Sequence, residues 1–520
     1  MTLSTLCRLY GVETEYRDME GRLRRPAPDS ILKVLQALGA PAGRFRDVPQ
    51  AVRFRREQMR GLPGKAFAQT GRSWGAFLPL HALYSERSRG AGDLTDLGSL
   101  ARWVGERGGR WMGTLPLLPT YLDRPFDPSP YAPVSRLFWS EFWIDLTRIP
   151  EWKRSASARR SSPGSPRRRW VDYRGLMRAK RRALEAMSRT MLSGGGARLR
   201  HFRRFLHENP RVEEYARFRA AQEGKDAAFY HEYAQWQAQE QMDALVRTAR
   251  ENGVRLALDL PLGVHPSGYD AWKYRDLFAQ GISVGAPPDP FFTRGQNWGF
   301  APLHPERIRR EKYRYFTECI RHQMRAAGLL RIDHVMGLRR LFWIPAGAPA
   351  AEGVYVRYPA EEMAEVLCRE SRRHRCEVVG EDLGTVPPEV RSMMRRKGLR
   401  RMFVFQFEFH PGRKPSFPDP SPDSVAFLNT HDMAPFEKFR RSLKRGPTVD
   451  EALAALAAGP AKILMVSLED LWSERVPQNR PGMGPGRRNW SRRARFPLER
   501  FVRMPRVLET LCEIDDLRKR

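Results

Sequence analysis

The chain has 520 residues, 41% of them apolar, and its 91 Lys and Arg against 59 Asp and Glu give a formal charge of +32. No run of about 18 apolar residues occurs, which argues against a membrane-spanning helix, and the first residues lack the basic-then-apolar order of a secretory signal. The five cysteines are scattered and form no CxxC pair, so a disulfide or zinc framework is not expected, and the pattern favours a cytoplasmic protein with reduced thiols.

Residues 1–70 are expected to form a small helical segment. Its clearest part is PDSILKVLQALGAP, in which Pro-Asp-Ser is a helix-start signal and the closing Gly and Pro are stop signals. Four apolar residues of this stretch are predicted to share one helix face, namely Ile31, Val34, Leu35 and Leu38.

Eight short apolar runs follow, each ended by polar, Gly or Pro residues. They lie at 73–80, 110–117, 254–262, 328–335, 376–384, 401–409, 424–432 and 462–470. Helix-like stretches separate several of them. Near-continuous apolar strands that alternate with helices are typical of a parallel (β/α)8 barrel, an α/β fold. A doubly wound sheet is the alternative, but the count of eight and the length favour a TIM barrel over 71–520.

The spacing of these runs is uneven. The gap between the second and third predicts an inserted, mostly helical subdomain at about 121–250. Within it, the low-complexity basic stretch 153–169 is predicted to be an exposed flexible loop. An active-site loop region is expected at about 263–325. After the eighth run we expect a closing helix and tail, and no C-terminal β-sandwich domain.

An acidic residue stands near the end of four of the runs, namely Asp259, Asp333, Glu381 and Asp432. A single such acid is usually a helix cap. In a barrel, however, the carboxyl ends of the strands converge at one mouth, where chemistry takes place. Paired carboxylates at this mouth suit cleavage of a glycosidic bond. A Mg²⁺ or Ca²⁺ site built from carboxylates is the competing interpretation.

Strand geometry distinguishes these acids from their neighbours. Residues i and i+2 of a strand share a face, so Arg331 is expected beside Asp333, where its charge favours the ionised carboxylate. Glu381 would need a raised pKa to act as an acid, which a dry setting could supply. Asp382 is expected to face outward and support the loop. His334 is expected on the face opposite Asp333, in a structural role.

The chain shows no motif for a cofactor, a metal or a nucleic acid. It contains no GxxxxGK, no strand-linked GxGxxG, no HExxH and no Cys/His cluster, so no metal or cofactor is predicted. The positive charge could favour anionic partners, and the basic stretch could tether the chain to one. Because the charge is spread widely, we expect a solvated Arg-rich surface and no nucleic-acid partner.

Several long motifs occur in an order known from one enzyme family. They include SWGAFLPLHAL, LDLPLGVHPSGYDAW, RIDHVMGL, GEDLGTVPPEVR, NTHDM and PQNRPGMGPGRRNW. The chain resembles the 4-alpha-glucanotransferases (amylomaltase, or disproportionating enzyme) of glycoside hydrolase family 77 in the alpha-amylase superfamily. The resemblance covers nearly the whole chain.

The resemblance implies three catalytic residues. Asp333 matches the nucleophile that forms a glucosyl-enzyme, Glu381 the general acid and base, and Asp432 the third acid, which grips the hydroxyls of the distorted sugar. It further implies substrate-binding roles for Tyr131, Asp259, Asp289, Trp298, Arg331 and His431. Of these, Tyr131 would stack on the reacting glucose, and Asp289 and Trp298 would belong to a mobile loop over the donor and acceptor sites.

The implied activity is a retaining transfer of α-1,4-glucan segments to the 4-hydroxyl of an acceptor glucan or glucose. The implied partners are maltooligosaccharides, starch or glycogen. A hydrolase of the same fold and a non-catalytic glucan- or polyanion-binding protein remain as alternatives. The loop GVHPSGYDAW departs from the better-known members, which leaves the roles of His265 and Asp270 open.

Overall fold

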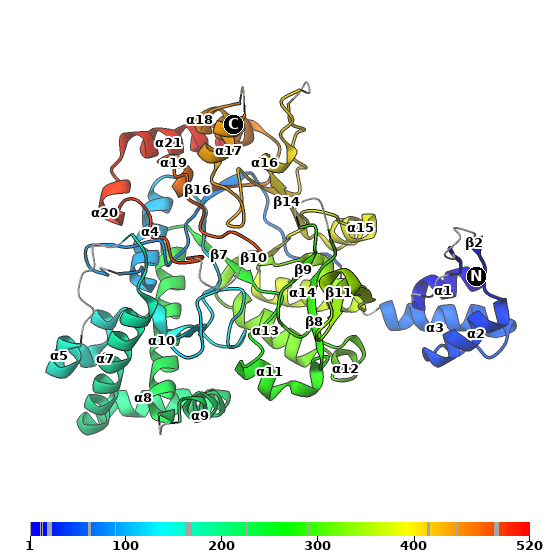
Figure 1. Cartoon of the computed structure of the whole chain (residues 1–520), viewed down its shortest axis with the longest axis horizontal. Coiled ribbons are helices and arrows are strands. Elements are labelled where there is room, and N and C mark those ends of the chain that lie inside the picture. Colours follow the sequence, from blue (N-terminus) through cyan, green and yellow to red (C-terminus); the bar gives the residue numbers. More distant parts are fainter. Residues whose placement is uncertain are drawn as a thin grey trace. The chain divides into compact units, whose positions relative to one another are not determined.

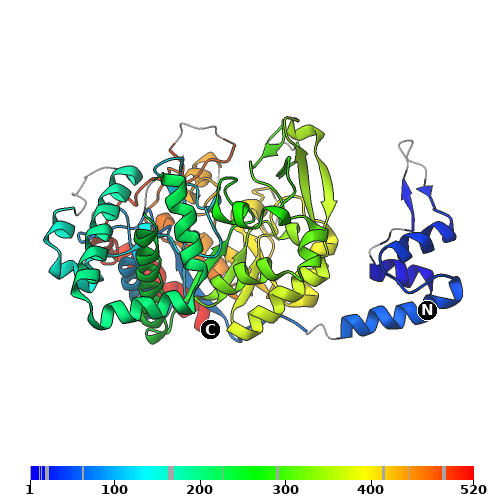
Figure 2. The ribbon, with the colours of Figure 1, turned by 90° about the horizontal axis from the view of Figure 1, so that it is seen from below.

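The computed structural model describes residues 2–10, 12, 14–17, 23–60, 64–88, 90–161, 169–224, 227–288, 292–412, 416–443, 446–482 and 488–520. Contacts between residues divide the chain into two units, 1–64 and 65–520 (Figures 1 and 2). Within the described ranges, no helix is long and apolar enough to cross a membrane.

The first unit packs three helices around a small apolar core. Its elements are α1 (Leu3–Tyr10), β1 (Tyr16–Arg17), β2 (Leu23–Arg24), α2 (Pro28–Ala37), a short 3-10 helix (Phe45–Asp47) and α3 (Val48–Arg60). The predicted helix is present as α2, but only part of its predicted apolar face is buried. Leu32 is buried beside Ile31 and Leu35, whereas Val34 and Leu38 are 48% and 43% exposed. The face of α2 that packs into the small core is therefore formed by Ile31, Leu32 and Leu35.

The second unit is built on a closed barrel of eight parallel strands, so the predicted (β/α)8 fold is confirmed. The strands are β3 (Ser73–Phe77), β4 (Trp111–Gly113), β7 (Arg255–Leu260), β10 (Ala327–Ile332), β13 (Glu377–Gly380), β14 (Arg400–Val404), β15 (Ser424–Phe427) and β16 (Ile463–Ser467). They neighbour one another in this order, and β16 pairs with β3 to close the barrel.

Large apolar side chains fill the barrel interior. Trp111, Met402 and Met465 belong to one buried cluster there. Space is short around Trp111, because a Cβ atom at Gly75 would lie 2.3 Å from the Cβ of Trp111 on the neighbouring strand. The barrel is therefore a packed core, and its free space lies at the mouth.

Helices cover the outside of the barrel (Figure 1). The longer helices that contact a barrel strand are α4 (Leu94–Glu106), α10 (Ala228–Glu251), α13 (Arg314–Met324), α14 (Ala360–His374), α15 (Pro388–Lys397), α18 (Val449–Ala458) and α21 (Pro505–Lys519). The shorter α16 (Phe405–Glu408), α17 (Phe436–Ser442), α19 (Leu468–Leu471) and α20 (Leu498–Phe501) lie in the connections. The residues described after β16 form helices and loops, with no strand among them.

Between β4 and β7 the chain forms a mostly helical insertion. It contains β5 (Tyr121–Leu122), β6 (Phe126–Asp127), 3-10 turns at Glu141–Trp143 and Leu146–Arg148, α5 (Pro150–Arg154), α6 (Ala156–Arg160), α7 (Tyr173–Gly194), α8 (Gly196–Glu208) and α9 (Arg211–Glu223). The predicted loop at 153–169 is wrong for its first part, which is helical. Ser155 caps α6, and Ala158 is fully buried against the core, so packing overrides the polar composition. Residues 162–168 lie outside the described residues.

A four-stranded antiparallel sheet and two helical turns belong to the loops that follow β7 and β10. The sheet has the order β12 (Val354–Arg357), β11 (Arg340–Pro345), β8 (Ile282–Ala286) and β9 (Gln296–Asn297). The helices are α11 (Tyr269–Lys273) and α12 (Pro305–Arg310), with 3-10 turns at Arg275–Leu277, Val335–Leu338 and Ala350–Glu352. This sheet positions the segment that carries Trp298, whose backbone N donates to the carbonyl of Val284 at 2.8 Å.

Candidate active site

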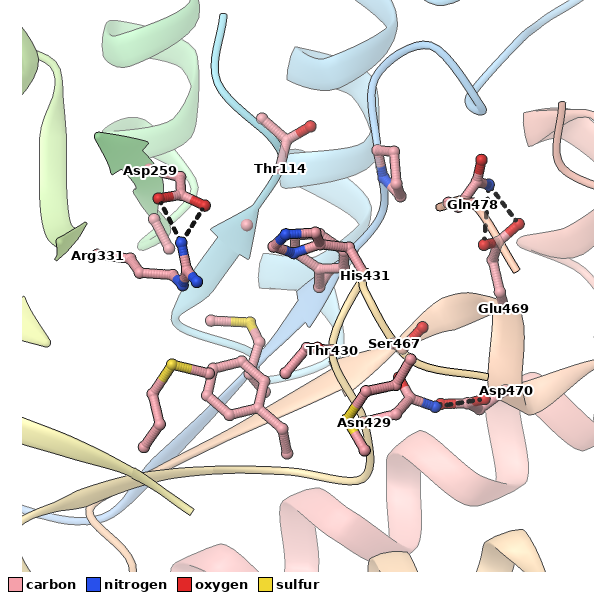
Figure 3. A pocket seen from close by; sticks show the side chains of 18 of the residues that line it. Thr114, Asp259, Arg331, Asn429, Thr430, His431, Ser467, Glu469, Asp470 and Gln478 are labelled. Carbon is pink, nitrogen blue, oxygen red and sulfur yellow. Dashed lines mark hydrogen bonds and ion pairs between the residues drawn. The ribbon is translucent and has the colours of Figure 1, made fainter. Parts of the chain in front are cut away.

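A pocket of about 960 Å³ opens at the carboxyl ends of the barrel strands. Its floor is apolar and includes Met402, Phe427 and Met465. Polar side chains form its walls, as Figure 3 shows: Asp259 and Arg331 lie on one side and His431 lies between them and the groups on the opposite side. The opposite wall carries two hydrogen-bonded pairs, Asn429 with Asp470 and Gln478 with Glu469.

One guanidinium joins Asp259, which lies within β7, to Asp333, which follows β10. Nη1 of Arg331 donates to both oxygens of Asp259, at 2.8 and 2.9 Å, and to Oδ1 of Asp333 at 3.0 Å. Arg331 and Asp333 thus lie on the same side of the chain, as their spacing predicts. The competing metal interpretation would require a cation between the carboxylates of Asp259 and Asp333. Arg331 occupies that position. Among the described residues, no cluster of three or more His, Cys, Asp or Glu is suited to a metal ion.

Glu381 is held at the end of β13 by two backbone donors. Its Oε2 accepts from the backbone N of His334 and its Oε1 from the backbone N of Leu383, each at 3.0 Å. Burial, opposed by Arg331 and reinforced by the nearby Asp333, raises the pKa of Glu381 to about 7. A carboxyl that keeps its proton near neutral pH can donate it to a leaving group.

Tyr131 links the Asp259 side of the pocket to Asp432. Its hydroxyl donates to Oδ2 of Asp259 at 2.6 Å. Burial, and to a smaller extent the charge of Asp259, raises the pKa of Tyr131 well above its ordinary value, so the phenol stays protonated. The ring stacks on His431 at 5.0 Å with an interplanar angle of 15°. At most one face of this ring is therefore left for a sugar.

His431 and Asp432 form an ion pair at the mouth. Nε2 of His431 lies 3.2 Å from Oδ2 of Asp432, whose side chain is 45% exposed. Burial disfavours the imidazolium, but the carboxylate of Asp432 outweighs it and raises the pKa of His431. Burial likewise opposes ionisation of Asp432, yet the charge of His431 and the hydrogen bond from Asn479 lower the pKa of Asp432 to about 2. Asp432 is therefore a carboxylate throughout the physiological range.

Asp382, the neighbour of Glu381, faces away from the pocket. It is 2% exposed, and its carboxylate accepts from Nε of Arg401 at 2.7 Å and from the backbone N of Met402 at 3.0 Å. These bonds tie the end of β13 to β14. Asp382 therefore supports the loop that presents Glu381, as strand alternation predicts.

The structure describes only one of the two residues, Asp289 and Trp298, that were predicted to belong to the loop over the donor and acceptor sites. The ring of Trp298 packs edge-on against His334, the residue after Asp333, at 5.2 Å. Asp289 lies outside the described residues. His334 has an unusual backbone for a non-glycine residue, with φ +47°, and its N–H donates to Glu381. Its predicted structural role thus includes holding Glu381.

His265 and Asp270, whose roles the sequence leaves open, are bound by their own surroundings and, like Asp333, Glu381 and Asp432, are not among the residues that line this pocket. Nδ1 of His265 accepts from the backbone N of Ser267 within its own loop. Asp270 is fully buried and accepts from Oγ of Ser135 at 2.5 Å, the hydroxyl of Tyr315 at 2.6 Å and the backbone N of Arg136 at 2.8 Å. Asp270 is thus a structural acceptor.

We expect Asp270→Ala to lower the free energy of unfolding by about 3 kcal/mol, because it leaves buried donors without an acceptor. Urea or thermal unfolding measures the change. The exposed Asp276 provides the matched control, and Asp276→Ala should change stability by about 0.5 kcal/mol or less. Equal stabilities of the two variants would contradict this assignment.

Two residues near the acids were not singled out from the sequence. Nδ2 of Asn479 donates to Oδ1 of Asp432 at 2.6 Å, and the ring of Trp490 lies 5.6 Å from Tyr131 and 5.7 Å from His431. Both come from the segment after β16, which has neither strand nor helix periodicity. Their motif, PQNRPGMGPGRRNW, contributes to the family resemblance but does not indicate which of its residues reach the pocket.

Comparison with known proteins decides the family. The model of glycoside hydrolase family 77, described as 4-alpha-glucanotransferase, matches residues 78–229 and 219–499. The chain belongs to glycoside hydrolase family 77. The 4-alpha-glucanotransferase of Mycobacterium tuberculosis is 31% identical over 546 residues, which cover 87% of this chain and 74% of the relative. That of Thermus thermophilus is 29% identical over 372 residues, covering 64% of this chain and 72% of the relative.

Solved structures of family members agree with the fold. The amylomaltase from Corynebacterium glutamicum superposes with a TM-score of 0.76 at 21% identity and covers 99% of both chains. The amylomaltase from Streptococcus agalactiae, solved in complex with acarbose, gives a TM-score of 0.75 at 20% identity, covering 86% of this chain and 99% of that one. At these identities the likeness concerns the fold, and the roles of individual residues must be argued from the geometry above.

Proposed function

We propose that this family 77 enzyme transfers α-1,4-glucan segments by a retaining double displacement in which Glu381 and Asp333 act as a pair. The proposal depends on the contrast between these two carboxyl groups. Asp333 accepts a hydrogen bond from the guanidinium of Arg331, whereas Glu381 is buried and its pKa is raised to about 7. Groups whose surroundings favour opposite protonation states are suited to act as nucleophile and acid on the same bond.

In the first step, the carboxylate of Asp333 attacks the anomeric carbon of the donor while Glu381 protonates the leaving oxygen. The bond between the anomeric carbon and the leaving oxygen breaks, and a covalent glucosyl-enzyme forms. In the second step, Glu381 removes the proton from the 4-hydroxyl of an acceptor, which attacks the same carbon and releases Asp333. Two inversions give net retention. Asp432, ionised by its pairing with His431, would accept hydrogen bonds from the hydroxyls of the distorted ring.

The substrates we propose are maltooligosaccharides and the longer α-1,4-glucans of starch or glycogen type. An open pocket with aromatic and charged walls suits a sugar chain. Transfer rather than hydrolysis requires that an acceptor glucan reach the intermediate more effectively than water, and membership of the 4-alpha-glucanotransferase family supports this. The five cysteines are free and four of them are buried, which supports a location in the reducing cytoplasm.

Incubation with maltotriose tests the proposal. Transfer gives glucose and a ladder of longer maltooligosaccharides, because each turnover lengthens one chain at the expense of another. Hydrolysis would give only maltose and glucose, and a binding protein would leave maltotriose unchanged. Separation of the products by chromatography distinguishes the three outcomes, and either of the last two would overturn the proposal.

The raised pKa of Glu381 predicts a falling rate on the alkaline side. The proposed first step needs the protonated form, so kcat/KM for maltotriose should fall by about tenfold per pH unit above roughly pH 7. Samples returned to neutral pH after each exposure control for inactivation. A profile that stays flat well above neutral pH would contradict the assignment of Glu381 as the acid.

A further inference from the structure

Two separate parts of the chain hold the two oxygens of Asp432. His431, its neighbour, lies 3.2 Å from Oδ2, and Asn479 donates to Oδ1 at 2.6 Å. The side chain of Asp432 is 45% exposed, whereas Asn479 is 9% exposed, so the amide approaches from the protein side. An aspartate carboxylate can rotate about its last bond, and the combination of these two contacts fixes that rotation.

Asn479 belongs to a segment, residues 474–482 and 488–493, that we call the strap. A buried ionic network anchors it to the barrel. Arg492 is 1% exposed, and it donates to Glu469 at 2.7 Å and to Glu474 at 3.3 Å. Gln478 donates to both oxygens of Glu469, at 3.0 and 3.1 Å, and its carbonyl oxygen lies 3.0 Å from Nε2 of His81. The residue before Asn479 is therefore fixed to the end of β16.

The strap is also tied to the helical insertion. The hydroxyl of Tyr173, the first residue of α7, donates to the carbonyl of Trp490, and the backbone N of Val171 donates to the carbonyl of Ser491 at 2.7 Å. Trp490 has a φ of +58°, a left-handed conformation that is costly for a bulky residue. Such a conformation persists only where the surroundings impose it, here the rings of Tyr131 and His431 and the hydroxyl of Tyr173.

The backbone of Trp490 in turn bonds to the part of the strap that carries Asn479. Its N donates to the carbonyl of Gln478 at 2.9 Å, one residue before Asn479. A chain of contacts thus runs from α7, through Trp490 and Gln478, to Asn479 and the carboxylate of Asp432. Each residue in this series of contacts is packed against, or hydrogen-bonded to, the residues before and after it in the series.

We propose that Asn479 is a positioning residue for Asp432, held in place by the strap, so that both oxygens of the carboxylate point correctly at the reacting sugar. This inference rests on the proposed role of Asp432. Asn479 acts through Asp432, and its amide N–H can only donate, which favours the ionised carboxylate. Among the described residues, the other charged or titratable groups that act on Asp432 include His431 from its own loop, Arg331 from β10 and Tyr131 from the insertion.

Asn479→Asp tests the proposal, because it keeps the shape and replaces the donor by a second acid. At neutral pH the two carboxylates repel each other and the hydrogen bond is lost, so kcat should fall by about 100-fold. As the pH is lowered, the paired carboxyls take up one shared proton, which restores a donor to Asp432. The deficit relative to wild type should therefore shrink at acid pH. Asn479→Ala should lower kcat at every pH with no such recovery.

Gln239→Glu is the matched control, since Gln239 donates to the carboxylate of Asp243 at 2.9 Å on the surface of α10. This variant should keep the wild-type rate and pH profile. A wild-type rate in Asn479→Asp, or a deficit that is the same at every pH, would overturn the proposal. If Asn479→Asp does not fold, a folded Asn479→Ala with a wild-type kcat overturns it equally. Asp432→Asn distinguishes failure of this inference from failure of the proposed function. An active Asp432→Asn would refute the proposed function of Asp432 itself.

Discussion

Asp333→Asn should abolish glucan transfer, with a loss on the order of 10⁴-fold or more in kcat. The amide cannot attack the anomeric carbon, so no covalent glucosyl-enzyme forms and neither half of the reaction proceeds. The variant should still fold, because Arg331 keeps its two hydrogen bonds to Asp259. The readout is the ladder of products from maltotriose, and Asp276→Asn on the surface is the control.

An activated donor assigns this loss to the nucleophile. α-Maltosyl fluoride carries a leaving group that departs without a proton, so it bypasses the need for an acid but not the need for a nucleophile. Asp333→Asn should therefore be as inactive with the fluoride as with maltotriose. Release of fluoride at a rate near that of the wild type would contradict the role proposed for Asp333.

The fold could be predicted because a parallel barrel buries both faces of each strand. Each strand then appears as an uninterrupted apolar run, and all eight runs correspond to barrel strands. The prediction is wrong where packing overrides local composition. The polar stretch of α6 is helical because Ala158 is fully buried, and the apolar Val34 and Leu38 are exposed because α2 presents Leu32 instead. Neither outcome can be read from single residues.

The acids of the site could be predicted for a related reason. They follow strands whose ends converge, so position along a strand places Asp259, Asp333 and Glu381 near one mouth. The polar support around them could not be predicted in this way. Asn479 and Trp490 reach Asp432 and its neighbours from an irregular segment, and their positions depend on buried contacts with residues far away in the sequence, such as Tyr173. Periodicity carries no information on such contacts.

The surroundings of Glu381 show a second limit. A sequence can suggest that a carboxyl acts as an acid, but burial and its local donors decide whether it keeps a proton. Here the backbone N–H groups of His334 and Leu383 favour the carboxylate, and burial outweighs them. One of these donors belongs to His334, a residue with a φ of +47°. Backbone geometry thus tunes the group that the sequence only identifies.

Glu381→Ala should separate the two half-reactions, which is the sharpest test of its double role. With maltotriose, the loss of the acid should lower kcat by about 10⁴-fold, since protonation of the leaving oxygen and activation of the acceptor are both affected. With α-maltosyl fluoride, Asp333 can still attack, so fluoride is released once per enzyme molecule. The glucosyl-enzyme then accumulates, because no base activates the next acceptor, and mass spectrometry should detect the added maltosyl group.

Azide completes this test, because it is a small anionic nucleophile that needs no base. Added to Glu381→Ala with the fluoride donor, it should restore turnover and yield maltosyl azide of retained configuration. Asp333→Asn should not respond to azide, since it forms no intermediate for azide to attack. Rescue with inverted configuration would mean that azide attacks the donor directly, and it would refute a covalent intermediate on Asp333. The pair of variants thus distinguishes a double displacement from a single one in the same assay.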